Sequence, residues 1–202
     1  MDRIFIAVLA GMMLMAAGIT NASTVVNFDD LPLHPVPSTY AGISWGTSSE
    51  DGFLGNTGEF YVENDPFLSP PHSSPNFVIN IYGVNNLWFH FSSPVTFDGA
   101  WFTRLTGAYT LPGDIATQVR VRDNLGNTSS WLDLSTTPQY LAANFIGSQT
   151  IFIERQGGAN TSQWYTMDDV TYSNTVPEPS TIILISAGLG GVVLLRWKSR
   201  KQ

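Results

Sequence analysis

Apolar and polar side chains alternate with a period of two residues along most of the middle of the chain. Val119 and Val121, for example, alternate with Arg120 and Arg122. Successive side chains of a β-strand point to opposite faces, so this period indicates strands that each bury one face. We predict strands at 24–28, 42–46, 59–63, 76–82, 87–92, 95–103, 117–123, 149–154 and 164–172, and one more near 130–134 or 139–145.

Helical patterns are missing from the same part of the chain. No window as long as a typical helix shows an apolar stripe of helical period. Parallel strands need crossover helices, so most α/β folds are excluded. The sequence therefore predicts an all-β fold, an antiparallel two-sheet β-sandwich, with a jelly roll as the first choice and an immunoglobulin-like sandwich as the second.

The N-terminus has the pattern of a signal peptide. Arg3 precedes an apolar stretch from Ile4 to Ala17, and small residues follow up to Ala22. We predict a signal peptide at 1–22 that is cleaved after Ala22. A retained N-terminal anchor is the weaker alternative, because the apolar stretch is short for a membrane span.

The C-terminus contains an uninterrupted apolar segment from Ile182 to Leu195. With its flanks it comes close to the lower length limit of a bilayer-spanning helix. Arg196, Lys198, Arg200 and Lys201 follow it and would keep the C-terminus in the cytoplasm. We predict a Pro-Glu-Pro motif and linker at 175–181, a transmembrane helix at 182–197 and a basic cytoplasmic tail at 198–202.

Pro177, Glu178 and Pro179, the apolar segment and the basic cluster, in this order, closely resemble the PEP-CTERM sorting signal of Gram-negative bacteria. The resemblance implies that the export machinery first exports the chain, and that a membrane-embedded exosortase then recognises and processes this end. It also implies an exported protein that is anchored through its C-terminal helix and reaches the cell surface or extracellular matrix after processing. Proteins with this signal commonly accompany exopolysaccharide production. A permanent membrane anchor behind a proline linker is the alternative.

The predicted mature domain, residues 23–174, is strongly acidic. Between Ser23 and Pro179 the chain has four arginines, no lysine and fifteen acidic residues, which gives a net charge of −11. Nucleic acids are bound mainly through clustered Lys and Arg, so we expect no nucleic-acid partner. The chain has no cysteine, which excludes disulfides and thiolate metal sites. One domain with a substantial apolar core is expected.

The two ends of this domain resemble the first and last strands of galactose-binding-like jelly rolls, found in many carbohydrate-associated exported domains. The matching segments are Val26 to Pro32, followed by Tyr40 to Trp45, and Trp164 to Tyr172. The resemblance implies that the terminal strands lie side by side and that acidic residues near this seam hold a structural Ca²⁺ ion, which needs six to eight oxygen ligands. The candidate ligands are Asp29, Asp30, Asp168 and Asp169.

Alternation along a strand limits this calcium site. Asp29 and Asp30 should point to opposite faces, as should Asp168 and Asp169, so we expect one carboxylate from each pair. The alternative is that all four cap turns and are solvated.

Aromatic residues are the candidates for a ligand platform. Most should be packed between the two sheets. Trp131, beside the polar segment Asn127 to Ser130, and Tyr109, near the turn at Pro112, are the least obviously buried. We therefore name Trp131 and Tyr109 as candidate sugar-binding residues.

Motifs for catalysis are missing from the sequence. It has no Gly-x-Ser-x-Gly elbow, no metalloprotease helix and no phosphate-binding glycine loop. We therefore expect no catalytic residues. Together with what the sorting-signal resemblance implies, this predicts a non-catalytic exported envelope or matrix protein that associates with exopolysaccharide, either by binding sugar or as a component of the matrix itself. The alternative is a secreted glycan-acting hydrolase, whose carboxylate pair depends on a spacing that sequence does not give.

Overall fold

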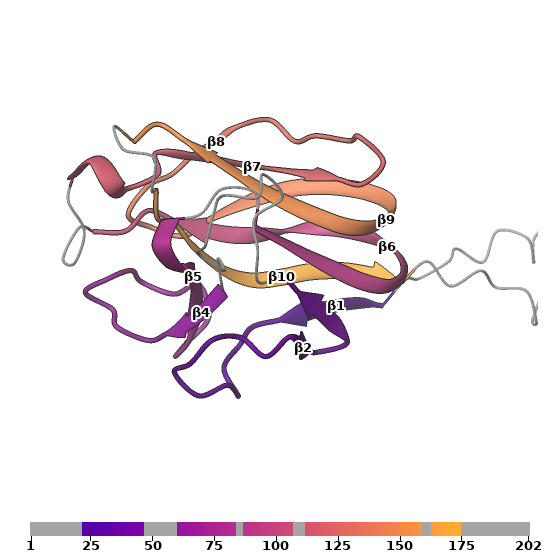
Figure 1. The fold of residues 1–202 in the computed structure, drawn as a ribbon, viewed down its shortest axis with the longest axis horizontal. Coiled ribbons are helices and arrows are strands. Elements are labelled where there is room, and N and C mark those ends of the chain that lie inside the picture. The colour runs from indigo at the N-terminus through magenta and orange to yellow at the C-terminus, as the bar shows by residue number, and fades with distance from the viewer. Residues whose placement is uncertain (1–21, 47–59, 84–86, 107–111, 159–162, 175–202) are drawn as a thin grey trace, which may run out of the picture. The chain divides into compact units, whose positions relative to one another are not determined.

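The computed structural model describes residues 22–46, 60–83, 87–106, 112–158 and 163–174. These residues form one compact unit of antiparallel strands with two short 3₁₀ helices, η1 (Ile81–Gly83) and η2 (Pro112–Asp114), and contain no α-helix (Figure 1). The predicted all-β fold is confirmed. The strands are β1 (Ser23–Val26), β2 (Thr39–Tyr40), β3 (Ile43–Trp45), β4 (Phe60–Glu63), β5 (Phe77–Asn80), β6 (Leu87–Thr103), β7 (Gln118–Asp123), β8 (Leu132–Asp133), β9 (Gln139–Gln156) and β10 (Thr166–Asn174).

The strands are joined by hydrogen bonds into one curled sheet rather than two separate ones. Its order is β4-β5-β10-β6-β9-β7-β8, with β1 added to β10 and β3 added to β6. The strands β6 and β9 have 17 and 18 residues and pair with each other along most of their length. The predicted strands 87–92 and 95–103 are thus the two halves of β6, and the predicted 139–145 and 149–154 belong to β9.

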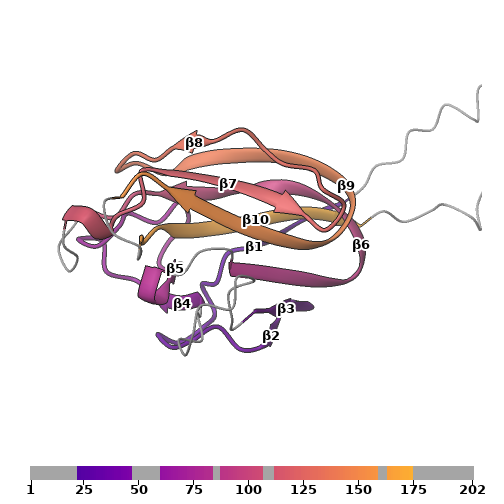
Figure 2. The same cartoon turned by 45° about the horizontal axis from the view of Figure 1, so that its top comes forward.

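Both long strands turn through a corner, which folds the sheet into two layers (Figure 2). Phe89 and Phe97 lie in the same strand, where full extension would separate them by about 26 Å. Their ring centroids are only 5.7 Å apart, because β6 bends at Ser92 to Pro94. The corner of β9 contains Gly147, which has φ 78°, and the pairing of β9 with β6 shifts register there. The predicted sandwich is therefore one folded sheet.

The two layers divide the strands between them. The first layer holds β3, β7, β8 and the halves of β6 and β9 at 87–91 and 149–156. The second layer holds β1, β4, β5, β10 and the other halves of β6 and β9. Trp45 packs between them against Phe28, Phe60 and Phe89 at centroid distances of 5.2 to 5.4 Å. Such aromatic packing stabilises the domain without disulfides.

The predicted end segments fall outside the part of the chain that the structure describes. This holds for the signal peptide apart from Ala22, for the linker at 175–181, for the transmembrane helix at 182–197 and for the tail at 198–202. Within the described ranges, no helix has the length and apolar character to cross a bilayer. The end segments stay predictions from the sequence.

Candidate functional site

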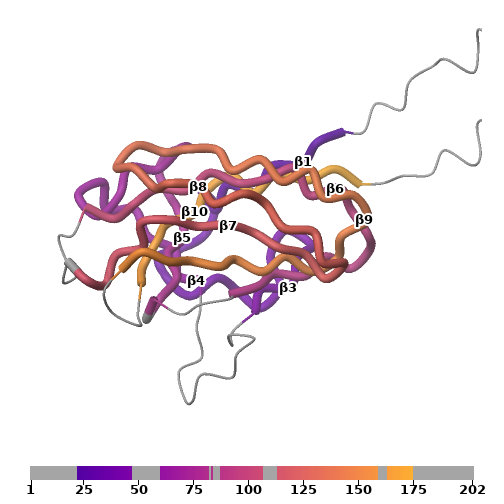
Figure 3. The backbone as a smooth tube through the Cα atoms, turned by 90° about the horizontal axis from the view of Figure 1, so that it is seen from above, coloured from indigo at the N-terminus to yellow at the C-terminus, as the bar shows by residue number. Residues whose placement is uncertain are grey.

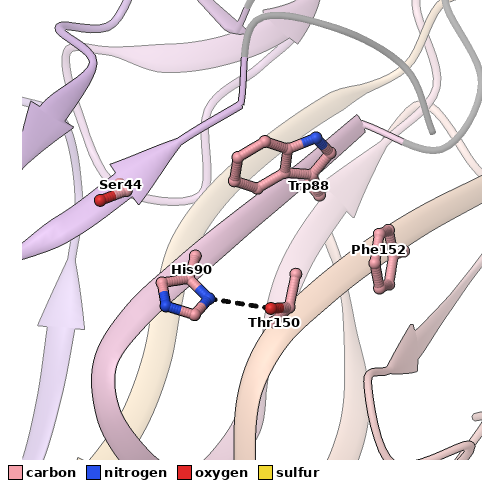
Figure 4. A pocket seen from close by; sticks show the side chains of 5 residues that line it. All are labelled: Ser44, Trp88, His90, Thr150 and Phe152. Carbon is pink, nitrogen blue, oxygen red and sulfur yellow. Dashed lines mark hydrogen bonds between the residues drawn. The ribbon is translucent and has the colours of Figure 1, made fainter. Parts of the chain in front are cut away.

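The candidate site lies on the solvent side of the first layer, which we call the outer face. Alternation turns Leu87, Phe89 and Ile151 into the core and leaves the neighbouring side chains on the solvent side. Cross-strand pairing then aligns Ser44 with His90 and His90 with Thr150, and it aligns Trp88 with Phe152. These five outward residues line an open hollow of about 460 Å³ (Figure 4).

Trp88 is held in place by a glycine on the adjacent chain segment. The Gly46 N–H donates to the Trp88 carbonyl at 2.9 Å. A Cβ on Gly46 would lie 2.4 Å from the indole ring, so the absence of a side chain there lets the ring lie against the backbone. The indole is partly buried on this side and faces the hollow with the rest of its surface.

Polar groups lie beside the two aromatic rings. His90 and Thr150 share a hydrogen bond between Nδ1 and Oγ1 at 2.9 Å, and both side chains are partly exposed (Figure 4). Ser44 adds an exposed hydroxyl from β3. Aromatic rings next to a few fixed polar groups are the usual lining of a binding site for a neutral organic ligand.

Arginine side chains extend the aromatic surface across β7. The Arg122 guanidinium lies 4.1 Å from the Phe152 ring centroid, and that of Arg120 lies 4.5 Å from the ring centroid of Trp131. Glu154 accepts hydrogen bonds from the Nε of both arginines and fixes their planes. A strip from Trp88 to Trp131 therefore runs over β6, β9 and β7 to the residue before β8, which corresponds to about 15 Å at the usual strand spacing.

The sequence-predicted ligand residues have different outcomes. Trp131 lies on the outer face, partly buried, with Arg120 over its ring. Tyr109 lies outside the described residues. Sequence reasoning did not name Trp88 and Phe152, although the alternation in 87–91 places Trp88 and His90 on one side of the strand.

The acidic residues lie at the seam between the terminal strands. Strand β1 pairs with β10, so the side-by-side arrangement of the two ends is confirmed. The loop before β5 lies against this seam: the Ser73 N–H donates to Asp168 at 2.8 Å, and the Asn76 N–H donates to Asp29 at 3.0 Å. Asp30 instead accepts a hydrogen bond from the Tyr40 hydroxyl at 2.5 Å.

The expected alternation of Asp168 and Asp169 is wrong. Both carboxylates accept hydrogen bonds from the Ser73 hydroxyl, so both lie on the same side of the strand. The cause is a bulge in β10, where Asp169 has φ 46° and the register shifts before Thr171. A bulge inserts an extra residue and re-aims a side chain.

The calcium site stays a prediction. Protein donors already contact the candidate carboxylates, and His72 Nδ1 lies 2.5 Å from an oxygen of Asp169. Among the residues that the structure describes, no group of three or more His, Asp or Glu side chains is arranged to hold a metal ion.

Asp168 is expected to make the stability of the domain depend on pH. It is 3% exposed, and burial, with the Asp169 charge adding to it, raises its pKa to about 7. The folded state therefore binds this proton more tightly than the unfolded chain. We expect the free energy of unfolding to fall by about 2–4 kcal/mol as pH rises from about 4 to about 7, and to level off above that.

Denaturant unfolding of wild type and Asp168→Asn, in buffer with a chelator, measures this effect. The amide keeps the shape of the protonated carboxyl and cannot ionise, so the variant should lose most of the pH dependence. The His72–Asp169 contact is present in both proteins. The contribution of Asp168 is therefore the difference in pH dependence between wild type and variant. Equal slopes in wild type and variant would contradict the assignment.

Comparison with known proteins identifies one end of the chain. Residues 175–201 match the PEP-CTERM protein-sorting motif, and Pro177, Glu178 and Pro179 fall inside the match. The chain carries a PEP-CTERM sorting motif. The motif implies an exported protein with an exosortase as its processing partner.

The chain matches no curated protein. The solved structures that are similar to it include two at 12% identity each. The N-terminal CBM22-1–CBM22-2 tandem domain of Paenibacillus barcinonensis Xyn10C has a TM-score of 0.41, covering 81% of this chain and 50% of that chain. The CBM51 from Clostridium perfringens GH95, in complex with methyl-galactose, has a TM-score of 0.30, covering 74% and 99%. The chain thus spans half the length of the first structure, and its fold is assigned from its strand pairing.

Proposed function

We propose that the chain is an exported, non-catalytic protein that binds polysaccharide at the cell surface or in the extracellular matrix. The observation that carries the proposal is the pair of outward rings, Trp88 and Phe152, on adjacent strands beside the His90–Thr150 hydrogen bond. The sorting motif supplies the destination.

The chemistry of the outer face fits a sugar chain. One side of a sugar ring presents C–H groups, which pack well against a flat indole or phenyl ring, and its hydroxyls need nearby donors and acceptors. Trp88 offers the larger ring, and Phe152 offers the surface that the Arg122 guanidinium over its ring leaves open. Ser44, His90 and Thr150 offer polar atoms. The hollow is open, and Arg122 and Arg120 extend the surface beside it from Phe152 to Trp131, so a chain of several sugar units can lie along this face.

A binding assay with the full-length protein separates the possible roles. We would run it in detergent through native gels that contain neutral or acidic polysaccharides, and measure the chain length of each polysaccharide afterwards. The proposal predicts that at least one polysaccharide retards the protein and keeps its length. Shortening of the polysaccharide would instead support the glycan-acting hydrolase, and migration unaffected by every polysaccharide would contradict binding.

The sorting step has its own test, the intact mass of the protein recovered from its native cells. We expect the mass to lack the segment from Ile182 to Gln202, because the exosortase removes it after export. A mass that still includes this segment would replace the cleaved signal with a permanent anchor.

A further inference from the structure

One end of the domain is formed by the corners of the two long strands. We call it the turn end and define it by residues 91–97, 124–128 and 142–149. Two aliphatic side chains project from it into solvent, Leu125 with 60% and Ile146 with 73% of its surface exposed. Leu125 lies beside the residue that follows Ile146, because a Cβ on Gly147 would be 4.0 Å from a methyl group of Leu125. A hollow of about 420 Å³ adjoins Ile146.

The turn end has no charged residue in its three segments. Asp123, which precedes the second segment, is 1% exposed, and its carboxylate accepts hydrogen bonds from Ser148, Leu125 and Asn127. Asp98, further along β6, is hydrogen-bonded with Ser23. An uncharged end with exposed aliphatic side chains is unexpected in a domain that has fifteen acidic residues and four arginines between Ser23 and Pro179.

The C-terminal strand ends at this same place. Ser173 pairs with Thr96, and Thr96 pairs with Ile146, so Ile146 lies two strands from Ser173, or about 10 Å. Figure 3 shows the ends of β1 and β10 beside the corners of β6 and β9. Seven residues, 175–181, separate the end of β10 from Ile182, where the apolar segment begins, and they reach at most about 25 Å.

We propose that the turn end rests on the phospholipid surface while the C-terminal segment is in the bilayer, with Leu125 and Ile146 in the headgroup region. This inference rests on the proposed sorting function, since that function places the apolar segment in a membrane. The short linker keeps this end of the domain near the bilayer. Apolar side chains bind the interface by burial, and an uncharged contact surface avoids repulsion between the acidic domain and anionic lipids.

The chain has no cysteine, so single cysteines can report on this contact. We would label Leu125→Cys and Ile146→Cys with an environment-sensitive fluorophore in the full-length protein. Phe67→Cys is the matched control, because Phe67 is 80% exposed and lies away from the turn end. Its carbonyl accepts a hydrogen bond from Thr106, which follows the C-terminal end of β6. In phosphatidylcholine vesicles we expect a blue shift, a severalfold rise in emission and quenching by spin-labelled lipid at 125 and 146, with none of these at 67.

The outcomes separate this inference from the function on which it rests. Protein that does not float with the vesicles would contradict the membrane segment and thus the proposed sorting route. Protein that floats, with labels at 125 and 146 as aqueous as the label at 67, would overturn the lipid contact alone. Labels that become shielded only after an exosortase is added would also overturn it, because the surface would then bind the enzyme.

Discussion

Replacing Trp88 by alanine is expected to weaken polysaccharide binding by about tenfold to a hundredfold. The indole is the larger ring in the hollow of the outer face, and truncating a central aromatic contact costs about 1.5–3 kcal/mol of binding free energy. Trp88 is only partly buried, so the variant is expected to remain folded. Affinity electrophoresis across a series of polysaccharide concentrations gives the two dissociation constants.

Phe67→Ala is the control for this variant. It also removes an exposed aromatic ring, but from a loop outside the outer face. We expect its affinity to equal that of wild type. Unchanged binding by Trp88→Ala, or an equal loss in both variants, would show that binding does not depend on this hollow.

Gly99→Ala is expected to destabilise the domain by about 3 kcal/mol or more. Gly99 lies in β6 between β9 and β10, with φ 150°, in a region that residues with a side chain rarely adopt. An added Cβ would meet the carbonyl oxygen of Leu141 at 2.1 Å and the Tyr140 ring at 2.9 Å. The backbone of the adjacent strand would have to move, and urea unfolding followed by tryptophan fluorescence measures the cost.

Gly126→Ala isolates the contribution of the backbone conformation. Gly126 has φ 89°, but in the described part of the chain no atom lies within 4 Å of its added Cβ. We therefore expect a smaller loss of about 1 kcal/mol. Similar losses in the two variants would show that the close approach of β9 to Gly99 does not matter.

Alternation predicted where the strands lie but not how the long ones continue. Ser92-Ser93-Pro94 has the composition of a turn, and the strands predicted from the sequence, 87–92 and 95–103, lie on either side of its centre. In the structure the same residues bend the strand, and β6 pairs with β9 on both sides of the bend. Strand β2, with two residues, is too short to show a period at all.

The bulge in β10 marks a limit of the same reasoning. A period of two assumes an extended backbone at every position, and Asp169 departs from it with a positive φ. Because position 169 is an aspartate and not a glycine, the sequence does not signal a positive φ there. Consequently the seam between the terminal strands was predicted, whereas the shared contact of Asp168 and Asp169 with Ser73 was not.

Outward orientation alone also did not reveal which aromatic rings are open to a ligand. Trp101 is partly exposed on the second layer, but the His72 ring stacks on it at a centroid distance of 3.6 Å and an angle of 11°. The His72 loop is distant in sequence, so only the tertiary structure shows this cover. Trp88 instead faces an open hollow.

The most direct test of polysaccharide binding by the outer face is a two-dimensional NMR titration of the tryptophan indole N–H groups. The ligand is a short fragment of the polysaccharide that retards the protein most. The account predicts saturable shifts for Trp88 and smaller ones for Trp131, with Trp45 in the core and Trp101 on the other layer unchanged. Shifts confined to Trp101, with Trp88 unchanged at saturation, would contradict it.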